Sequence, residues 1–227
     1  TLTFGIVGLG RIGTATALRA KALGFRVIFH DPYLPNGADK AVGITRARTL
    51  DELLSQTDVL SLHCPLNEET RHLIAEPELA LLKPSAFVVN TARGGVIKKT
   101  AILAALRENR IAGAGLDVIE DEPLRTADEA ATPNLIATCH AAFCSVESKI
   151  EMRSTSARIA LASVRNETLE NVVNGVCSGG GSHPTPLEGP LLFRRLTCAV
   201  HGFSRSGPGN QTAAARPRPA SACRARF

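Results

Sequence analysis

Three glycines near the start of the chain restrict its fold more than any other feature. The stretch GIVGLGRIG holds Gly8, Gly10 and Gly13, with an apolar strand pattern before them and a helical pattern after them. In this spacing the first glycine permits a tight turn, the second lets the backbone approach a pyrophosphate, and the third lets a helix pack closely on a strand. The helix N-terminus offers free N–H groups to the phosphates. The motif therefore predicts a strand–turn–helix unit that binds a dinucleotide.

An acidic residue at the end of the next predicted strand indicates which dinucleotide is bound. RVIFH reads as a strand, and Asp31 follows it directly. A carboxylate at this place can accept hydrogen bonds from the ribose hydroxyls of NAD and repels the 2′-phosphate of NADP. Arg11, inside the glycine loop, can also reach a phosphate. We therefore predict NAD as the cofactor; the alternative is a structural glycine turn in some other α/β protein.

Apolar runs alternate with helical patterns along the chain up to about residue 140. Strands that are continuous apolar runs, each followed by a helix, are typical of a parallel sheet covered on both faces. The expected fold class is therefore α/β, with a doubly wound parallel sheet. Strands are predicted at 2–7, 26–30, 58–63, 86–90, 111–118 and 134–138, and helices at 11–24, 49–56, 76–83, 99–109 and 146–165. Thr49 and Glu52 have the spacing of a capping box.

Three polar residues follow successive predicted strands, at the edge where open α/β sheets bind their ligands. Arg93 and His140 come just after strands, and Glu122 lies in the loop between them. A guanidinium can hold a substrate carboxylate, and an imidazole can exchange a proton near neutral pH. A carboxylate beside the imidazole orients the ring and favours its protonated form. The set predicts hydride transfer at C2 of a 2-hydroxy acid.

The chain resembles the D-isomer-specific 2-hydroxyacid dehydrogenases, and within them most closely the branch that contains the C-terminal-binding proteins. The resemblance is carried by GIVGLGRIG, LRAKALGFRVIFHDPYLPNG, LSLHCPLNEETRHLI, VVNTARGG, AGAGLDVIEDEP and HAAF, which run almost continuously over residues 4–174. It implies a Rossmann NAD-binding domain with catalytic Arg93, Glu122 and His140. Glu122 is preferred to the two acids before it because it directly precedes the proline.

The resemblance also implies a set of cofactor contacts beyond the three glycines. They are Arg11, Ile12, Asp31, Cys64, Pro65, Thr91 and Asp117. Asp117 is expected to hold the nicotinamide carboxamide. The sequence departs from the family where an acidic residue normally caps the helix after the ARGG motif. Lys98 stands there, so we expect the helix at 99–109 to begin without a side-chain cap.

Two functions from different classes fit the resemblance. The first is an NAD-dependent oxidoreductase that acts on the CH–OH group of a D-2-hydroxy acid and reduces the corresponding 2-keto acid. The second is a C-terminal-binding-type transcriptional corepressor, which uses NAD(H) as a regulatory ligand and binds transcription factors. We expect a homodimer in the full-length protein, in the cytoplasm for the enzyme and in the nucleus for the corepressor. The six cysteines form no CxxC pair, and we predict neither a metal site nor a membrane partner.

Three regions are expected along the chain. They are an NAD-binding domain at 1–145, a returning helix and the end of a substrate domain at 146–174, and a disordered basic tail at 175–227. The net charge of +5 comes from the tail, which from Val176 onward has seven arginines and a single acidic residue. Because Thr1 falls at the first strand of the NAD-binding domain, we expect a fragment that binds NAD(H) but has no useful turnover alone.

Overall fold

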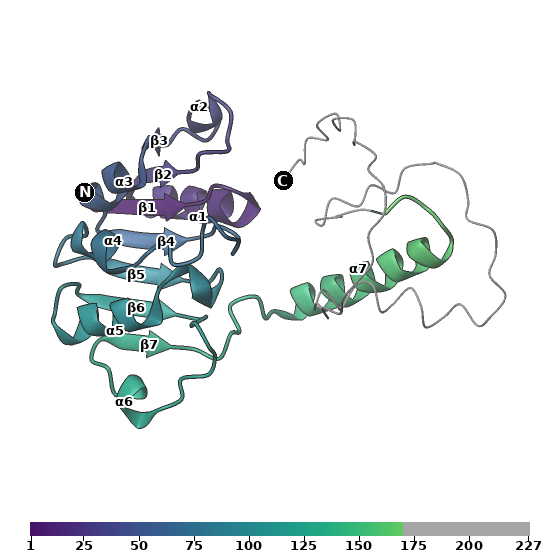
Figure 1. The fold of residues 1–227 in the computed structure, drawn as a ribbon. Coiled ribbons are helices and arrows are strands. Elements are labelled where there is room, and N and C mark those ends of the chain that lie inside the picture. The colour runs from purple at the N-terminus through teal and green to yellow at the C-terminus, as the bar shows by residue number, and fades with distance from the viewer. Residues whose placement is uncertain (170–227) are drawn as a thin grey trace, which may run out of the picture. The chain divides into compact units, whose positions relative to one another are not determined.

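The structure is a computed structural model that describes residues 1–169 (Figure 1). The chain divides into two units, Thr1–Glu151 and Met152–Phe227. Every strand in the described part of the chain belongs to the first unit. The predicted basic tail at 175–227 lies outside the described residues, and so does the end of the predicted region at 146–174.

One sheet of seven parallel strands forms the first unit, in the order β3-β2-β1-β4-β5-β6-β7. The strands are β1 (Thr3–Val7), β2 (Arg26–His30), β3 (Thr45–Arg46), β4 (Val59–Leu62), β5 (Phe87–Asn90), β6 (Gly113–Leu116) and β7 (Leu135–Ala137). The strand order reverses between β1 and β4, which is the doubly wound plan. All carboxyl ends therefore lie along one edge, where the arrowheads point in Figure 1. The predicted fold class is confirmed.

Helices connect successive strands, and one further helix, α7, follows the last strand. They are α1 (Arg11–Ala22), α2 (Ala38–Val42), α3 (Leu50–Gln56), α4 (Glu76–Ala80), α5 (Lys99–Arg107), α6 (Ala127–Ala130) and α7 (Val146–Val164), with a 3₁₀ helix η1 (Gly94–Val96). Thr49 caps α3 as predicted, because its Oγ1 accepts a hydrogen bond from Glu52 N at 3.1 Å. The Glu52 carboxylate accepts from the backbone of Arg48, one residue before the cap. None of the described helices is long and apolar enough to cross a membrane.

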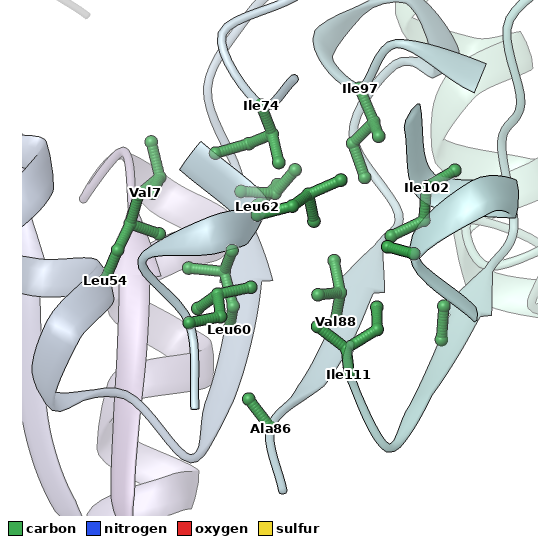
Figure 2. Packing of buried hydrophobic residues seen from close by; sticks show 14 of the residues in the cluster. Val7, Leu54, Leu60, Leu62, Ile74, Ala86, Val88, Ile97, Ile102 and Ile111 are labelled. Carbon is green, nitrogen blue, oxygen red and sulfur yellow. The ribbon is translucent and has the colours of Figure 1, made fainter. Parts of the chain in front are cut away.

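Two apolar layers hold the sheet between helices. In β1, Val7 belongs to the layer that includes α3, α4 and α5, whereas Ile6 packs with α1 on the other face. This alternation follows from the opposite directions of successive side chains in a strand. Figure 2 shows the larger layer, where Leu62 of β4 lies among Ile74, Ile97 and other labelled residues. Burying one such side chain contributes about 1.5–3 kcal/mol, so the strand ends are firmly held.

The start of α5 carries cations at the positive end of a helix. Lys98 is the N-cap residue and, as predicted, forms no side-chain cap hydrogen bond. Its Nζ contacts Glu76 Oε1 at 2.9 Å, and the Nζ of Lys99 contacts Glu129 Oε1 at 3.0 Å. Each cation therefore has a carboxylate partner, which offsets its unfavourable interaction with the helix dipole.

Candidate active site

The glycine motif forms the turn between β1 and α1. Gly8 has a φ of +85°, and a Cβ there would lie 2.8 Å from the backbone nitrogen of Cys64. A Cβ at Gly13 would lie 2.1 Å from the carbonyl oxygen of Gly8, whereas a Cβ at Gly10 would meet no atom within 4 Å. The turn is thus closed on one side and open over Gly10, next to the free N–H groups of α1. A phosphate oxygen can approach the backbone at this place.

Two predicted contact residues begin helix α1. Arg11 and Ile12 are both exposed, and together with Ala15, Thr16 and Arg19 they line a shallow hollow on the helix surface. The guanidinium of Arg11 is therefore free to approach an anion at the glycine turn.

The Asp31 carboxylate joins the glycine loop to the turn after β2. Its Oδ2 accepts a hydrogen bond from Leu9 N at 2.9 Å, and its Oδ1 accepts one from Tyr33 N at 3.0 Å. Each carboxylate oxygen has a second lone pair, which can accept a hydrogen bond from a ribose hydroxyl. Arg46, which the sequence analysis missed, holds this turn from β3 by donating to the carbonyls of Asp31 and Leu34 at 2.6 and 2.9 Å.

Cys64 and Pro65 follow β4 and lie across from the glycine turn. Cys64 is buried, and burial raises the pKa of its thiol to about 11. The thiol therefore stays protonated at neutral pH and is a packing group, not a nucleophile. Pro65 is exposed, and its carbonyl accepts a hydrogen bond from Thr70 Oγ1 at 2.6 Å. These residues offer backbone and apolar surface to a ligand beside the glycine turn.

The turn after β5 carries Thr91 and Arg93, and the buried residue Asn90 holds it. The Asn90 side chain donates to the carbonyl of Arg93 and accepts from the backbone of Ala92, both at 3.0 Å. Thr91 and Arg93 are exposed. The sequence analysis missed Asn90, although a polar residue that ends an apolar strand is a usable signal for such a role.

Asp117 organises the turn that carries His140. Its carboxylate accepts hydrogen bonds from the backbone of Ala141 and Ala142, both at 2.9 Å, and from the hydroxyl of Thr138. The Thr138 hydroxyl is the main cause that lowers the pKa of Asp117, and the two backbone donors add to it. This positioning role was not predicted from the sequence. One lone pair on Oδ2 is left for a carboxamide N–H.

Glu122 and His140 form a direct pair. Oε2 of Glu122 lies 3.0 Å from Nδ1 of His140, and Oε1 of Glu122 accepts from Ile119 N at 3.1 Å. The imidazole also meets the Phe143 ring edge-on, with centroids 6.2 Å apart. Because Nδ1 is engaged by the carboxylate, Nε2 is the nitrogen available for proton exchange. The pair joins the loops after β6 and β7.

An apolar hollow of about 390 Å³ lies at the carboxyl ends of β5, β6 and β7. Thr91 and Asp117 line it, together with Thr138, Ala141 and Ala142 of the His140 turn. Such a hollow suits a flat, mostly apolar ring with a few polar contacts at its rim. The hollow is not lined by Arg93, Glu122 or His140. In the chain, these three residues follow or precede the lining residues Thr91, Asp117 and Ala141 closely. Within residues 1–169, no three His, Cys, Asp or Glu side chains gather as a metal site requires.

The fold and these contacts define a Rossmann-type dinucleotide-binding domain. Residues 1–142 match the family described as "D-isomer specific 2-hydroxyacid dehydrogenase, NAD binding domain", and the chain belongs to this family. The match confirms that the chain contains an NAD-binding domain of this family, whereas the predicted bounds 1–145 stay a prediction. The residues present fit NAD, because the open glycine turn, the Asp31 carboxylate and the apolar hollow offer one place each for pyrophosphate, ribose and nicotinamide.

Named relatives extend this comparison. The chain is 41% identical over 173 residues to glyoxylate reductase of Aeropyrum pernix, covering 76% of the chain and 51% of that protein. It is 38% identical over 172 residues to D-3-phosphoglycerate dehydrogenase of Methanocaldococcus jannaschii, covering 76% and 33%. The solved D-lactate dehydrogenase from Aquifex aeolicus, complexed with NAD and lactic acid, is similar with a TM-score of 0.67 at 33% identity, covering 73% and 54%. The chain thus spans about half or less of the length of these relatives.

Proposed function

We propose that the protein is an NAD-dependent oxidoreductase that interconverts a 2-keto acid and a D-2-hydroxy acid. The observation that carries the proposal is the 3.0 Å contact between Glu122 Oε2 and His140 Nδ1 at the carboxyl edge of an NAD-binding sheet. The names of the relatives support small 2-keto and 2-hydroxy acids, such as glyoxylate and lactate, as the substrate class.

His140 is the proposed acid and base. With Nδ1–H donated to Glu122, a protonated imidazole gives its Nε2 proton to the carbonyl oxygen of a keto acid during reduction, and takes it back from the hydroxyl during oxidation. The Glu122 carboxylate fixes the orientation of the ring and stabilises the imidazolium. Bound NAD(H) supplies or accepts the hydride at C2.

Arg93 is the proposed anchor for the substrate carboxylate. Its Nη1 donates to the neighbouring carbonyl of Ala92 at 2.7 Å, which leaves further guanidinium N–H groups for a planar, two-point contact with a carboxylate. Asp117 lines the apolar hollow and is proposed to accept the carboxamide N–H of nicotinamide there. The hydride donor and the proton donor would then meet the substrate at one end of the sheet.

The corepressor hypothesis of the C-terminal-binding branch gains no support from the relatives described above, which are named as a reductase and as dehydrogenases. We therefore propose the enzymatic function. A homodimer and a cytoplasmic location stay predictions.

Turnover is tested in the complete open reading frame that contains this chain, by following NADH oxidation with glyoxylate, pyruvate or hydroxypyruvate. His140→Gln is expected to lower kcat by at least about a hundredfold, as loss of a general acid does, while the affinity for NADH stays nearly unchanged. Glu122→Gln is expected to lower kcat as well, because a neutral amide makes a weaker hydrogen bond with the ring than a carboxylate does. Asp51→Asn, an exposed change on α3, is the control. Unchanged turnover in His140→Gln would overturn the proposal.

A further inference from the structure

A third carboxylate lies two residues before Glu122 and has no part in the proposed reaction. Glu120 Oε1 accepts hydrogen bonds from His72 Nε2 at 2.6 Å and from Arg71 Nη2 at 3.1 Å, and Oε2 accepts from Lys99 N at 3.4 Å. Its side chain is only 16% exposed. Burial opposes its ionisation, but the hydrogen bonds from His72 and Lys99 hold the pKa of Glu120 below its ordinary value. The Glu120 carboxylate therefore joins its own loop to residues 71–72 and to the start of α5.

The segment that contains His72 also braces the loop after Arg93. His72 has a φ of +54°, and its backbone N–H donates to the carbonyl of Gly95 at 2.8 Å. Two residues on, Ile74 N donates to the carbonyl of Val96 at 3.1 Å. Residues 72–74 thus form a short hydrogen-bonded ladder with residues 95–96. This ladder fixes the position of the segment that follows Arg93.

The Arg93 and Glu122 loops touch each other backbone to backbone. A Cβ at Gly94 would lie 2.2 Å from the carbonyl of Ile119 and 2.6 Å from Glu120 N. Ile119 N in turn donates to Glu122 Oε1 at 3.1 Å. A shift of Glu120 therefore moves the backbone that orients Glu122.

The pair that these loops carry cannot hold its own geometry. The side chains of His140 and Glu122 are 44% and 38% exposed, and an ion pair exposed to water is too weak to order two loops. We infer that Glu120 is a positioning residue, whose contacts with His72, Arg71 and the start of α5 hold the Glu122 loop so that its carboxylate stays hydrogen-bonded to His140. The inference rests on the function proposed for Glu122 and His140, and it gives the buried carboxylate of Glu120 a role in that reaction.

The test is the tautomer of His140, read from the ¹⁵N shifts of its ring in the 227-residue chain at a pH where the imidazole is neutral. The hydrogen bonds of a histidine ring decide which of its two nitrogens carries the proton. Because Nδ1 of His140 contacts the Glu122 carboxylate, the native protein is expected to carry the proton on Nδ1. His140→Gln assigns the signal. Glu120→Ala is expected to lose this preference, and Glu120→Gln to keep part of it. If Glu120→Ala does not fold, His72→Asn replaces it, because asparagine tolerates the positive φ of this position. His72→Asn is also expected to weaken the preference of His140 for the proton on Nδ1.

Asp58→Asn is the matched control. Asp58 accepts from Thr3 N at 2.7 Å and Lys83 Nζ at 2.8 Å, and its side chain is 15% exposed, but it precedes β4 at the opposite edge of the sheet. The Asp58→Asn variant is expected to lower the urea midpoint about as much as Glu120→Gln and to leave the His140 tautomer unchanged. A lowered midpoint with an unchanged tautomer in the Glu120 variants would overturn the inference, and so would a tautomer shift in Asp58→Asn.

The tautomer needs no substrate, so it separates this inference from the proposed function. Absence of turnover in the protein made from the complete open reading frame would contradict the proposed function alone. Where turnover is present, Glu120→Gln is expected to lower kcat severalfold while the affinity for NADH stays unchanged. Equal kcat values for Glu120→Gln and the native enzyme would contradict the positioning role.

Discussion

Alanine at Gly13 and alanine at Gly10 are expected to affect different properties of the same loop. A Cβ at Gly13 would lie 2.1 Å from the carbonyl oxygen of Gly8, more than 1 Å inside an ordinary contact, so α1 and β1 must separate. Overpacking of this kind costs about 1–3 kcal/mol, and the better helix propensity of alanine returns about 1 kcal/mol. Because the clash is with the Gly8 backbone, which cannot rotate away as a side chain can, the cost lies in the upper part of this range, about 2–3 kcal/mol. Gly13→Ala is therefore expected to lower the free energy of unfolding by about 1–2 kcal/mol.

Gly10→Ala should leave the fold intact. Its Cβ meets no atom within 4 Å, and its backbone, with a φ of −74° and a ψ of −161°, suits alanine. The free energy of unfolding should change by less than about 0.5 kcal/mol. The methyl group, however, fills the opening proposed for the pyrophosphate. Loss of one hydrogen bond to a charged group costs about 1.5–3 kcal/mol, so the Kd for NAD should rise by about 10- to 150-fold.

Urea unfolding and calorimetric titration with NAD measure the two effects on the same samples. The native chain and Gly10→Ala should unfold at the same urea concentration, and Gly13→Ala at a lower one. Gly10→Ala with native affinity for NAD would refute the pyrophosphate approach at this turn. Gly13→Ala with native stability would refute the steric argument.

Three further predictions concern single side chains. Asp31→Ala should weaken NAD binding by about 1–3 kcal/mol and reduce the preference for NAD over NADP; equal binding of both cofactors by the native chain would contradict this. Asp117→Asn should destabilise the fold most at neutral pH. Because the hydrogen bond from Thr138 lowers the pKa of Asp117, the native carboxylate stabilises the fold above about pH 4 and loses this contribution as the pH falls through its lowered pKa. The urea midpoints of the two proteins should therefore converge as the pH falls below about 4, and a constant difference would contradict the argument. Lys98→Asp supplies the missing cap of α5 and should raise the free energy of unfolding by about 0.5–1 kcal/mol; a lower urea midpoint would show that the contact with Glu76 matters more.

The sheet and the glycine turn could be predicted from the sequence alone. Continuous apolar runs such as RVIFH predicted β2 at its exact bounds (Arg26–His30), and α7 ends one residue before the predicted limit. The local signals for the glycine turn and for the cap at Thr49 were also sufficient, because both depend on residues close together in the chain. Three short elements were not predicted. They are α2, α6 and β3, with five, four and two residues, too few to show a period.

Only the tertiary structure decided how the polar residues work together. The sequence placed Asp117 at the end of one strand, Glu122 in the loop after it and His140 just after the next strand. The structure showed that Asp117 holds the backbone of the His140 turn while Glu122 contacts the ring. The side-chain partners of Glu120 are 48 and 49 residues away in the chain. No local pattern can signal such a contact, because its geometry depends on the packing of strands that are neighbours in the sheet and distant in sequence.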